Sequence, residues 1–440
     1  MSRLILAVLA GSLALGMACA GGQGRPHRFT ESIVEGVVVA RNEGGPKYAG
    51  ELFRYEPQAV LVQDEGDPAS LLNRPEEVVV DEAGRFYVND RWNARIAVFA
   101  PDGRYERSIG RQGQGPGEVS TNIRIVALAD GVLTVTDHPR RRINRFSTDG
   151  TFLGSYRNPI PAGGHLWPIG DGRLLTISNH TIMREREDGL WLQAAGFCVH
   201  SAEGDSLAWA LPPVPHMKWI FTFATPGSGK GGMSRPRVPF TSDPDAVLVP
   251  GEGVLLGRGQ EPLLWFYDFT GRLVRTIDIG LDPRPVTSAL LRRFYDEHDA
   301  RMMAGDEAHR DWMRRCRTAL IFPEVIQLWD DVAVDTAGYV WLQVMQVTSG
   351  YEPAPIGSRT FYPGEQVAPG AENQPGFCWG GGSTYYLLSP EGELLGTTTA
   401  PVPGRAMRGR FVGTVTDPGT GAEEITVWRL IAAAEGFVYP

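Results

Sequence analysis

VVVDEAGRFYVNDRWNARIAVFAPDG, residues 78–103, is followed by a second version of itself, IVALADGVLTVTDHPRRRINRFSTDG, residues 125–150. The two stretches match at a constant offset of 47 positions. Identical residues that keep this offset include Asp90 and Asp137, Arg95 and Arg142, Phe99 and Phe146, and Gly103 and Gly150. Repetition at a period of about 45 residues indicates an architecture of successive copies, each of them one supersecondary unit.

Each copy predicts four short strands. Apolar residues alternate with polar ones over short runs, and Asp-x-x-Gly or x-Asp-Gly turns separate the runs. We name the four strands a, b, c and d in chain order. Four strands in about 45 residues make one blade of a β-propeller, whose blades surround a central channel. Weaker copies of the c–d turn follow at residues 202–204, 269–271 and 390–392, which brings the number of blades to five.

The sixth blade is expected to combine both ends of the chain. Residues 410–416 and 425–431 are interpreted as two of its strands, and residues 58–63 as its outer strand d. Such a closure leaves no open sheet edge between the last blade and the first. The sequence therefore predicts an all-β fold: a six-bladed β-propeller with four-stranded antiparallel blades, an N-terminal strand that closes the last blade, and one helical insertion.

The segment RPEEVVVDEAGRFYVNDRWNARIAVFAPDGRYERSIGRQGQGPGEV, residues 74–119, carries a resemblance to known proteins. It is similar to NHL-repeat proteins and to a bacterial family of exported six-bladed β-propellers with lipoprotein-like members. The resemblance implies this fold for most of residues 55–435. It implies no single function, because such propellers include lyases, lactonase-like enzymes and interaction modules. The patterns of the lactonase-like enzymes and of the copper- or zinc-dependent lyases are not matched by this sequence.

The first 20 residues are typical of an export signal. Arg3 supplies a positive charge, residues 4–15 are apolar, and residues 18–20 form a small-residue cleavage site. The setting of Cys19 also resembles a bacterial lipoprotein box, with Gly16 where a leucine is usual. Lipidation of Cys19 and ordinary cleavage after residue 20 are the two alternatives.

The expected organisation follows from these features. Residues 1–20 are a signal peptide or lipoprotein signal, 21–54 an N-terminal linker and extension, and 55–440 the propeller. We expect an exported protein, either a periplasmic or cell-envelope lipoprotein or a secreted protein, whose contact with a membrane is through a lipid on Cys19. The net charge of −9 and the lack of a basic stripe argue against a nucleic-acid partner.

Three cysteines follow the signal, so at most one intramolecular disulfide can form. Cys198 and Cys378 lie near predicted strands, whereas Cys316 lies in a stretch with a helical pattern. Cys198 and Cys378 are therefore the expected pair. The alternative is three buried free thiols.

The long segments between strands all belong to one face of the propeller. The a–b and c–d turns are minimal and open on one face, whereas b–c loops and d–a connections open on the other, which we call the long-loop face. Four long segments map to it: residues 180–189, 212–236, 282–322 and 346–383. The third predicts a helical insertion at 283–320, with Thr287 or Ser288 as its N-cap, and the fourth a loop insertion. Long loops on a rigid scaffold commonly carry binding function.

A column of mostly polar residues begins the a strands, at the channel mouth on the long-loop face: Glu77, Arg124, His165, Ala246 and Asp331. Convergent polar groups in a concave site suit a ligand. The alternative is a set of structural ion pairs, Glu77 or Asp331 with Arg124. Trp92, in the b–c loop of blade 1, is a further candidate contact, although loop tryptophans also pack against neighbouring loops.

No catalytic or metal signature supports an enzyme. Glu77, His165, Asp243 and Asp331 could in principle hold a divalent ion, but no HExxH pattern and no GxSxG elbow is present. We therefore expect no cofactor and a binding or scaffold protein for a protein, peptide or small-molecule ligand. A metal-dependent, lactonase-like hydrolase with its site at the channel mouth is the alternative.

Overall fold

The structure is a computed structural model, and it describes residues 26–158, 165–169, 173–178, 184–185, 191–201, 206–218, 221–224, 231–234, 240, 245–249, 251–257, 259–304, 307, 322–348, 378–416 and 423–440.

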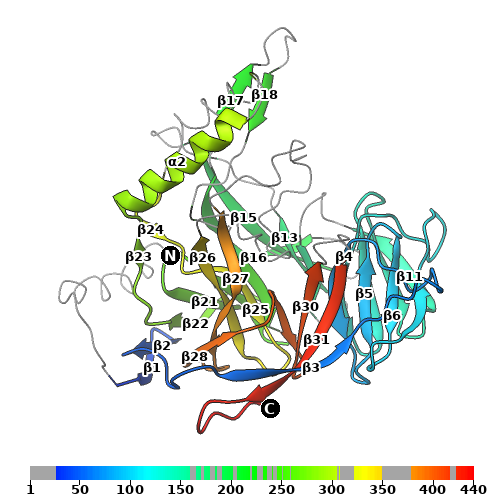
Figure 1. Cartoon of the computed structure of the whole chain (residues 1–440), viewed down its shortest axis with the longest axis horizontal. Helices are drawn as coiled ribbons and strands as arrows, with labels where there is room; N and C mark the ends of the chain where they lie inside the picture. The colour runs from blue at the N-terminus through cyan, green and yellow to red at the C-terminus, as the bar shows by residue number, and fades with distance from the viewer. Residues whose placement is uncertain are drawn as a thin grey trace.

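The described residues contain six sheets of four or more strands, which form the six blades (Figure 1). Blade 1 has the order β4 (Pro75–Val80), β5 (Phe86–Asp90), β6 (Arg95–Phe99) and β7 (Tyr105–Ile109). Blade 2 has β8 (Ile123–Ala129), β9 (Val132–Asp137), β10 (Arg142–Ser147) and β11 (Phe152–Arg157). Neighbouring strands in both blades are antiparallel, as the repeat predicts.

Three further blades keep the same order. Blade 3 has β12 (His165–Pro168), β13 (Leu174–Ser178), β15 (Trp191–His200) and β16 (Ser206–Lys218), and β14 (Arg184–Glu185) also pairs with β15. Blade 4 has β19 (Asp245–Val249), β20 (Gly253–Gly257), β21 (Leu263–Asp268) and β22 (Leu273–Asp278). Blade 5 has β25 (Trp329–Val334), β26 (Val340–Thr348), β27 (Cys378–Leu388) and β28 (Leu394–Thr399).

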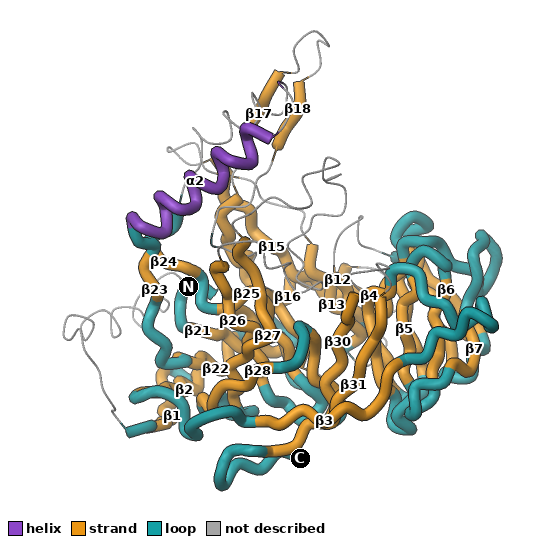
Figure 2. The backbone as a smooth tube through the Cα atoms, in the orientation of Figure 1, coloured by secondary structure: helices purple, strands orange, loops and turns teal. Residues whose placement is uncertain are grey.

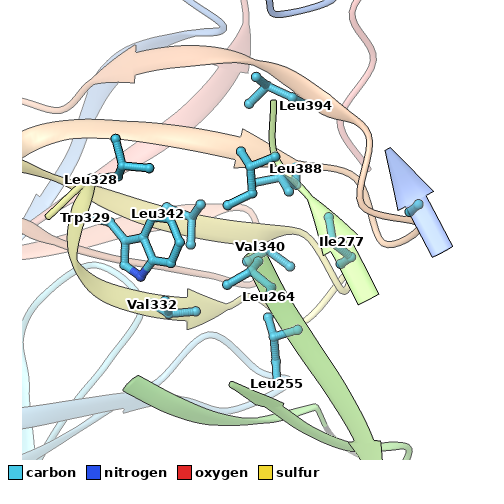
Figure 3. Close-up of a cluster of buried hydrophobic side chains, with 12 residues drawn as sticks. Leu255, Leu264, Ile277, Leu328, Trp329, Val332, Val340, Leu342, Leu388 and Leu394 are labelled. Carbon is cyan, nitrogen blue, oxygen red and sulfur yellow. The ribbon is translucent and has the colours of Figure 1, made fainter. Parts of the chain in front are cut away.

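Apolar side chains fill the space between adjacent blades. Figure 3 shows one such cluster, in which Leu255 and Leu264 of blade 4 point toward Trp329 and Leu342 of blade 5. Leu264, Trp329 and Leu342 have no exposed surface. Burial of large side chains at near-crystalline packing density is the main force that holds the blades together.

Blade 6 joins the two ends of the chain. Its order is β29 (Gly404–Met407), β30 (Arg410–Thr416), β31 (Glu423–Ala432) and β3 (Phe53–Val60), so the predicted N-terminal closing strand is confirmed. The strand begins at Phe53, however, five residues before the expected 58–63. A register shift at Pro57 breaks the alternation that marks a strand in the sequence.

The N-terminal residues before β3 are also folded onto the ring. β1 (Arg28–Val34) and β2 (Val37–Glu43) form a hairpin, and β2 pairs in parallel with β22, so blade 4 has six strands. The chain then bonds to β28, where Lys47 N–H donates to Leu394 O at 3.0 Å. We call residues 26–61 the N-terminal strap, because they run along the outer edges of blades 4, 5 and 6 (blue in Figure 1).

The helical insertion begins after a short pair of strands, β23 (Arg284–Pro285) and β24 (Val325–Ile326). Helix α2 spans Ser288–Ala304, and Thr287 is its N-cap, since Thr287 Oγ1 accepts a bond from Leu290 N–H at 3.2 Å. Phe294 of α2 packs on Phe240 and Met345, over the junction of blades 4 and 5. No helix in the described part of the chain is both long and apolar enough to cross a membrane.

Two of the expected long loops are partly strand. β16 continues to Lys218, opposite Trp191 of β15, although residues 212–236 were expected to form a loop. Pro212 and Pro213 fall at a register shift in this outer strand, where missing N–H groups cost little. β26 and β27 likewise pair as far as Thr348 and Cys378, inside the loop expected at 346–383. β17 (Phe221–Ala224) and β18 (Gly231–Ser234) form a further hairpin.

Candidate functional site

The long-loop face carries the described insertions. Figures 1 and 2 show α2, the β17–β18 hairpin and the ends of β15 and β26 on the same side of the molecule. The opposite side carries tight turns, the N-terminal strap and the C-terminus. The two faces of the ring are therefore built differently, and the candidate site residues begin the innermost strands on the long-loop face.

Glu77 on β4 and Arg124 on β8 meet across the gap between blades 1 and 2. Arg124 Nε lies 3.9 Å from Glu77 Oε1, so the pair is electrostatic and too long for a hydrogen bond. Asn89 Nδ2 donates to Glu77 Oε2 at 2.5 Å. Partly exposed pairs of this kind add little stability.

Asp331 on β25 pairs with Arg405 on β29, and not with Arg124. Arg405 Nη2 donates to Asp331 Oδ2 at 3.0 Å. Arg405 was missed in the sequence because β29 is short and carries no copy of the repeat motif. Four charged side chains thus alternate in sign around part of the channel mouth, in the order Asp331, Arg405, Glu77 and Arg124.

A small cavity of about 10 Å³ lies beside the Asp331–Arg405 pair. This is room for roughly one water molecule, so the cavity itself cannot hold an organic ligand. Tyr385 closes it on the blade 5 side, where its hydroxyl donates to Gly404 O at 3.0 Å. Burial raises the pKa of Tyr385 to about 12. Tyr385 therefore acts as a neutral brace between blades 5 and 6 at physiological pH.

The repeated aspartates and arginines are structural. Asp90 is fully buried and accepts bonds from Asn73 N–H at 2.7 Å, Asn93 Nδ2 at 2.9 Å and Arg95 Nε at 2.6 Å. Arg95 Nη2 in turn donates to Leu71 O at 2.7 Å. The pair thus fixes the connection that leads into blade 1.

Blade 2 repeats this arrangement. Asp137 is fully buried, Ser120 Oγ donates to its Oδ1 at 2.7 Å, and Arg142 Nε lies 3.4 Å from its Oδ2. Arg142 also donates to carbonyls of the glycine-rich connection, including Glu118 O. These contacts tie that connection, residues 113–118, to blade 2.

Trp92 is the most exposed of the candidate contacts. Its side chain is 56% exposed at the tip of the b–c loop of blade 1. Arg74 lies over the indole ring at 5.5 Å from its centroid. The backbone N–H of Trp92 donates to the backbone carbonyl of Asn73 at 3.2 Å, which fixes the loop that carries the ring. A fixed, exposed indole is a common anchor in protein and ligand interfaces.

His138 was not singled out in the sequence, yet it lies in the same part of the face. It occupies the b–c loop of blade 2, and its side chain is half-buried. Burial lowers its pKa, and the charges of Arg124 and Arg91 lower it further, against an opposite effect of Asp137. His138 corresponds to Arg91 at the repeat offset, so comparison of the two copies could have found it.

Several expected sites lie outside the described residues or are described only in their backbone. Cys19 and Asp243 are outside, and His165 is placed on β12 without its side chain. Cys198 and Cys378 lie on β15 and β27, in blades 3 and 5, and their pairing stays a prediction. Among the described side chains, no group of three His, Cys, Asp or Glu residues is arranged to hold a metal ion.

Comparison with known proteins agrees with the architecture. A family model described as a 6-bladed beta-propeller, DUF5128, matches residues 69–171, which include blades 1 and 2. No curated protein matches the chain. The match covers less than half of the sequence, so it supports the fold and leaves the family of the whole chain open.

Solved structures resemble the chain only distantly. A Bacteroides fragilis protein named as exported is 11% identical, with a TM-score of 0.46 over 89% of this chain and 98% of its own. A DUF4221 family member from Bacteroides vulgatus is 10% identical, with a TM-score of 0.42 over 88% and 98%. A gluconolactonase from Xanthomonas campestris is 12% identical, with a TM-score of 0.31 over 87% and 100%. Similarity at this level says nothing about activity. The six sheets and the family match together give the fold as a six-bladed β-propeller.

Proposed function

We propose that this protein is an extracytoplasmic binding or scaffold propeller that holds a partner protein, a peptide or a small ligand on its long-loop face. One observation carries the proposal. The described insertions emerge on that face, whereas the strap and tight turns occupy the other. Insertions on one face of a rigid ring are the usual form of a propeller binding surface.

The charged channel mouth and Trp92 support the same face. The alternating Asp331, Arg405, Glu77 and Arg124 side chains offer both signs of charge to a ligand. Trp92 adds an exposed apolar surface beside them. Polar groups that fix orientation, next to an aromatic anchor, are the usual composition of a recognition site.

Export is part of the proposal and is supported by the sequence. Residues 1–20 have the pattern of a signal peptide, and Cys19 is the candidate lipidation site. We also propose that the blades are NHL-like, on the strength of residues 74–119. Both features suit a protein that presents a binding face outside the cytoplasm.

The test compares how much ligand is retained by a variant substituted on the long-loop face and by one substituted on the opposite face. The chain lacking residues 1–20 is immobilised and exposed to cell-envelope extract, and retained material is identified by mass spectrometry. Trp92→Ala is expected to reduce retention at least tenfold, because removal of an anchor costs more than about 1.4 kcal/mol. Arg104→Gln, in the exposed c–d turn of blade 1 on the other face, is the matched control and should retain the same material.

Two results would contradict the binding proposal. Equal retention by both variants would remove the long-loop face from consideration. A stoichiometric divalent ion in protein prepared without chelator, lost in Glu77→Ala or Asp331→Ala, would favour the metal-dependent hydrolase and call for a screen of lactones and esters.

A further inference from the structure

The b–c loops of blades 1 and 2 gather arginines beside the channel mouth. We call residues 74–77, 91–94, 121–124 and 137–142 the arginine sector; it contains six arginines, two glutamates and Asp137, which pairs with Arg140 and Arg142. The whole chain has a net charge of −9. A positive surface on an acidic protein favours an anionic ligand there, because the local field attracts opposite charge.

Arg124 has hydrogen-bond donors to offer. The carboxylate of Glu77 is 3.9 Å from Arg124 Nε and is itself bonded by Asn89 at 2.5 Å. A guanidinium has five N–H donors in a planar fork. The interaction with Glu77 therefore balances the charge of Arg124 only weakly and leaves the fork able to bind two oxygens of a ligand.

The ring of His138 lies beside Arg124, because its Nε2 is 3.4 Å from Thr136 Oγ1 and Thr136 is the residue opposite Arg124 in the sheet. Arg91 donates a bond to Glu76, and its guanidinium has further N–H groups. The charges of Arg124 and Arg91 both act on the His138 ring and help to lower its pKa, after the larger effect of burial. Three nitrogen-bearing side chains from two adjacent blades thus lie within electrostatic range of one another.

The loops that carry these groups are held in fixed conformations. Ala94 and Arg141 occupy equivalent positions in the two b–c loops, and both have φ of 51°. Arg141 N–H donates to His138 O, and Ala94 N–H donates to Arg91 O, each at 3.1 Å. A left-handed conformation at a non-glycine residue costs free energy and persists only where the surrounding structure fixes it. A loop fixed in this way loses little entropy when a ligand binds.

We propose that an oxyanion group of the ligand, a carboxylate or a phosphate, binds between Arg91, Arg124 and His138. The two guanidinium groups donate N–H bonds to the oxyanion oxygens, and the imidazole ring of His138 donates a third. Trp92, in the same loop as Arg91, contacts the remainder of the ligand. This inference rests on the proposed function, since it names the chemistry of the ligand held on the long-loop face.

The site has a characteristic pH dependence. An anion beside the ring of His138 stabilises its protonated form and raises the pKa that burial, Arg124 and Arg91 lower in the free protein. By linkage, the anion binds more tightly when His138 is protonated. Affinity should therefore increase as the pH falls through the pKa of His138.

Nuclear magnetic resonance of histidine side chains tests the site directly. Protein labelled with carbon-13 in histidine and lacking residues 1–20 is titrated with inorganic phosphate and, separately, with citrate, and His138→Gln assigns the signal. We expect a saturable shift of the His138 signal that is larger at pH 6 than at pH 8. Arg91→Gln and Arg124→Gln should each weaken binding about tenfold, because each removes charge-assisted hydrogen bonds. Arg104→Gln should leave it unchanged.

Comparison of phosphate with citrate identifies which oxyanion the site prefers. The inference is wrong if neither anion shifts the His138 signal at millimolar concentration, or if the shift is undiminished in both arginine variants. The remaining histidine signals report whether each variant is folded. The binding proposal would survive such a failure, because retention by Trp92→Ala tests it without reference to charge.

Discussion

Asp90 illustrates, at the scale of one residue, how the repeat is stabilised. The carboxylate has no exposed surface and accepts three hydrogen bonds, one of them from Arg95. A buried charge is tolerated only where its partners are complete. Its counterpart Asp137 in blade 2 has the same role, so recurrence at the repeat offset marks a structural position and not a functional one.

Removal of this buried charge should be costly. We expect Asp90→Asn to lower the free energy of unfolding by about 3 kcal/mol, because Arg95 then lacks its charged partner in a buried site. Urea denaturation followed by circular dichroism measures the loss. Asp130→Asn makes the same change in an exposed a–b turn and should alter stability by less than about 0.5 kcal/mol. Similar losses in the two variants would show that the buried Asp90 carboxylate is not important for stability.

The residues of the proposed site differ between the copies. Glu77 corresponds to Arg124 at the repeat offset, and Arg91 to His138. Glu77 and Arg124 could be identified in the sequence because both begin an a strand. His138 and Arg405 were missed, the first because single histidines are commonly structural and the second because β29 has no copy of the motif.

At the scale of the element, the N-terminal strap is attached to blade 5 through Glu393. Lys47 Nζ donates to Glu393 Oε2 at 2.8 Å, and the ring of His27 lies 3.1 Å from Oε1. Burial alone would raise the pKa of Glu393, but bonds from Lys47 and His27 and the charge of Lys47 lower it below its usual 4.5. The ionised carboxylate therefore stabilises the folded state.

This attachment predicts a pH-dependent variant. A carboxylate whose pKa is lowered by folding adds stability above its unfolded value, and this stability is lost as the pH falls through the folded pKa. Glu393→Gln should therefore be less stable than the parent at pH 7, and the difference should narrow as the pH falls through the lowered folded pKa of Glu393. Thermal unfolding of both proteins at pH 7 and pH 3.5 measures it. A difference that is constant with pH would contradict an ionic attachment.

The elements differ in how far local sequence determines them. α2 was predictable together with its cap, because Thr287 and the apolar spacing after it are local signals. The position of β3 was not, because its first half is fixed by contacts of Phe53 with Phe437 and Tyr439 near the C-terminus. Such distant aromatic contacts leave no pattern in the strand itself.

At the scale of the molecule, the ring depends on the seam between blade 6 and blade 1. Val62 N–H donates to Gly103 O at 2.8 Å, just after β3 ends. Gly103 has φ of 88°, and a β-carbon there would lie 2.1 Å from Val60 O. The glycine of the first c–d turn therefore allows the closing strand to pass close to blade 1. The positive φ that it shares with Gly150, 88° and 98°, accounts for glycine at this position of the repeat.

Two deletions should separate the parts of the strap. Removal of residues before 45 takes away β1 and β2 and should leave a cooperative but less stable ring. Removal of residues before 62 also takes away β3, which exposes the edge of β31 and opens the seam. We then expect unfolding to lose its cooperativity and the chains to associate through the exposed edge. Circular dichroism melting and size-exclusion chromatography measure both effects. Equal melting temperatures for the two deletions would show that β3 is dispensable.

The position of β3 also determines when the ring can close during synthesis. The ribosome makes this strand within the first sixth of the chain, but its partner β31 ends only eight residues before the C-terminus. Blades 1 to 5 can each pair their own strands as these emerge from the ribosome. The ring cannot close until nearly the whole polypeptide has been made. If the protein is exported from its N-terminus, as we propose, it completes its ring only on the far side of the membrane, after the last strand has arrived.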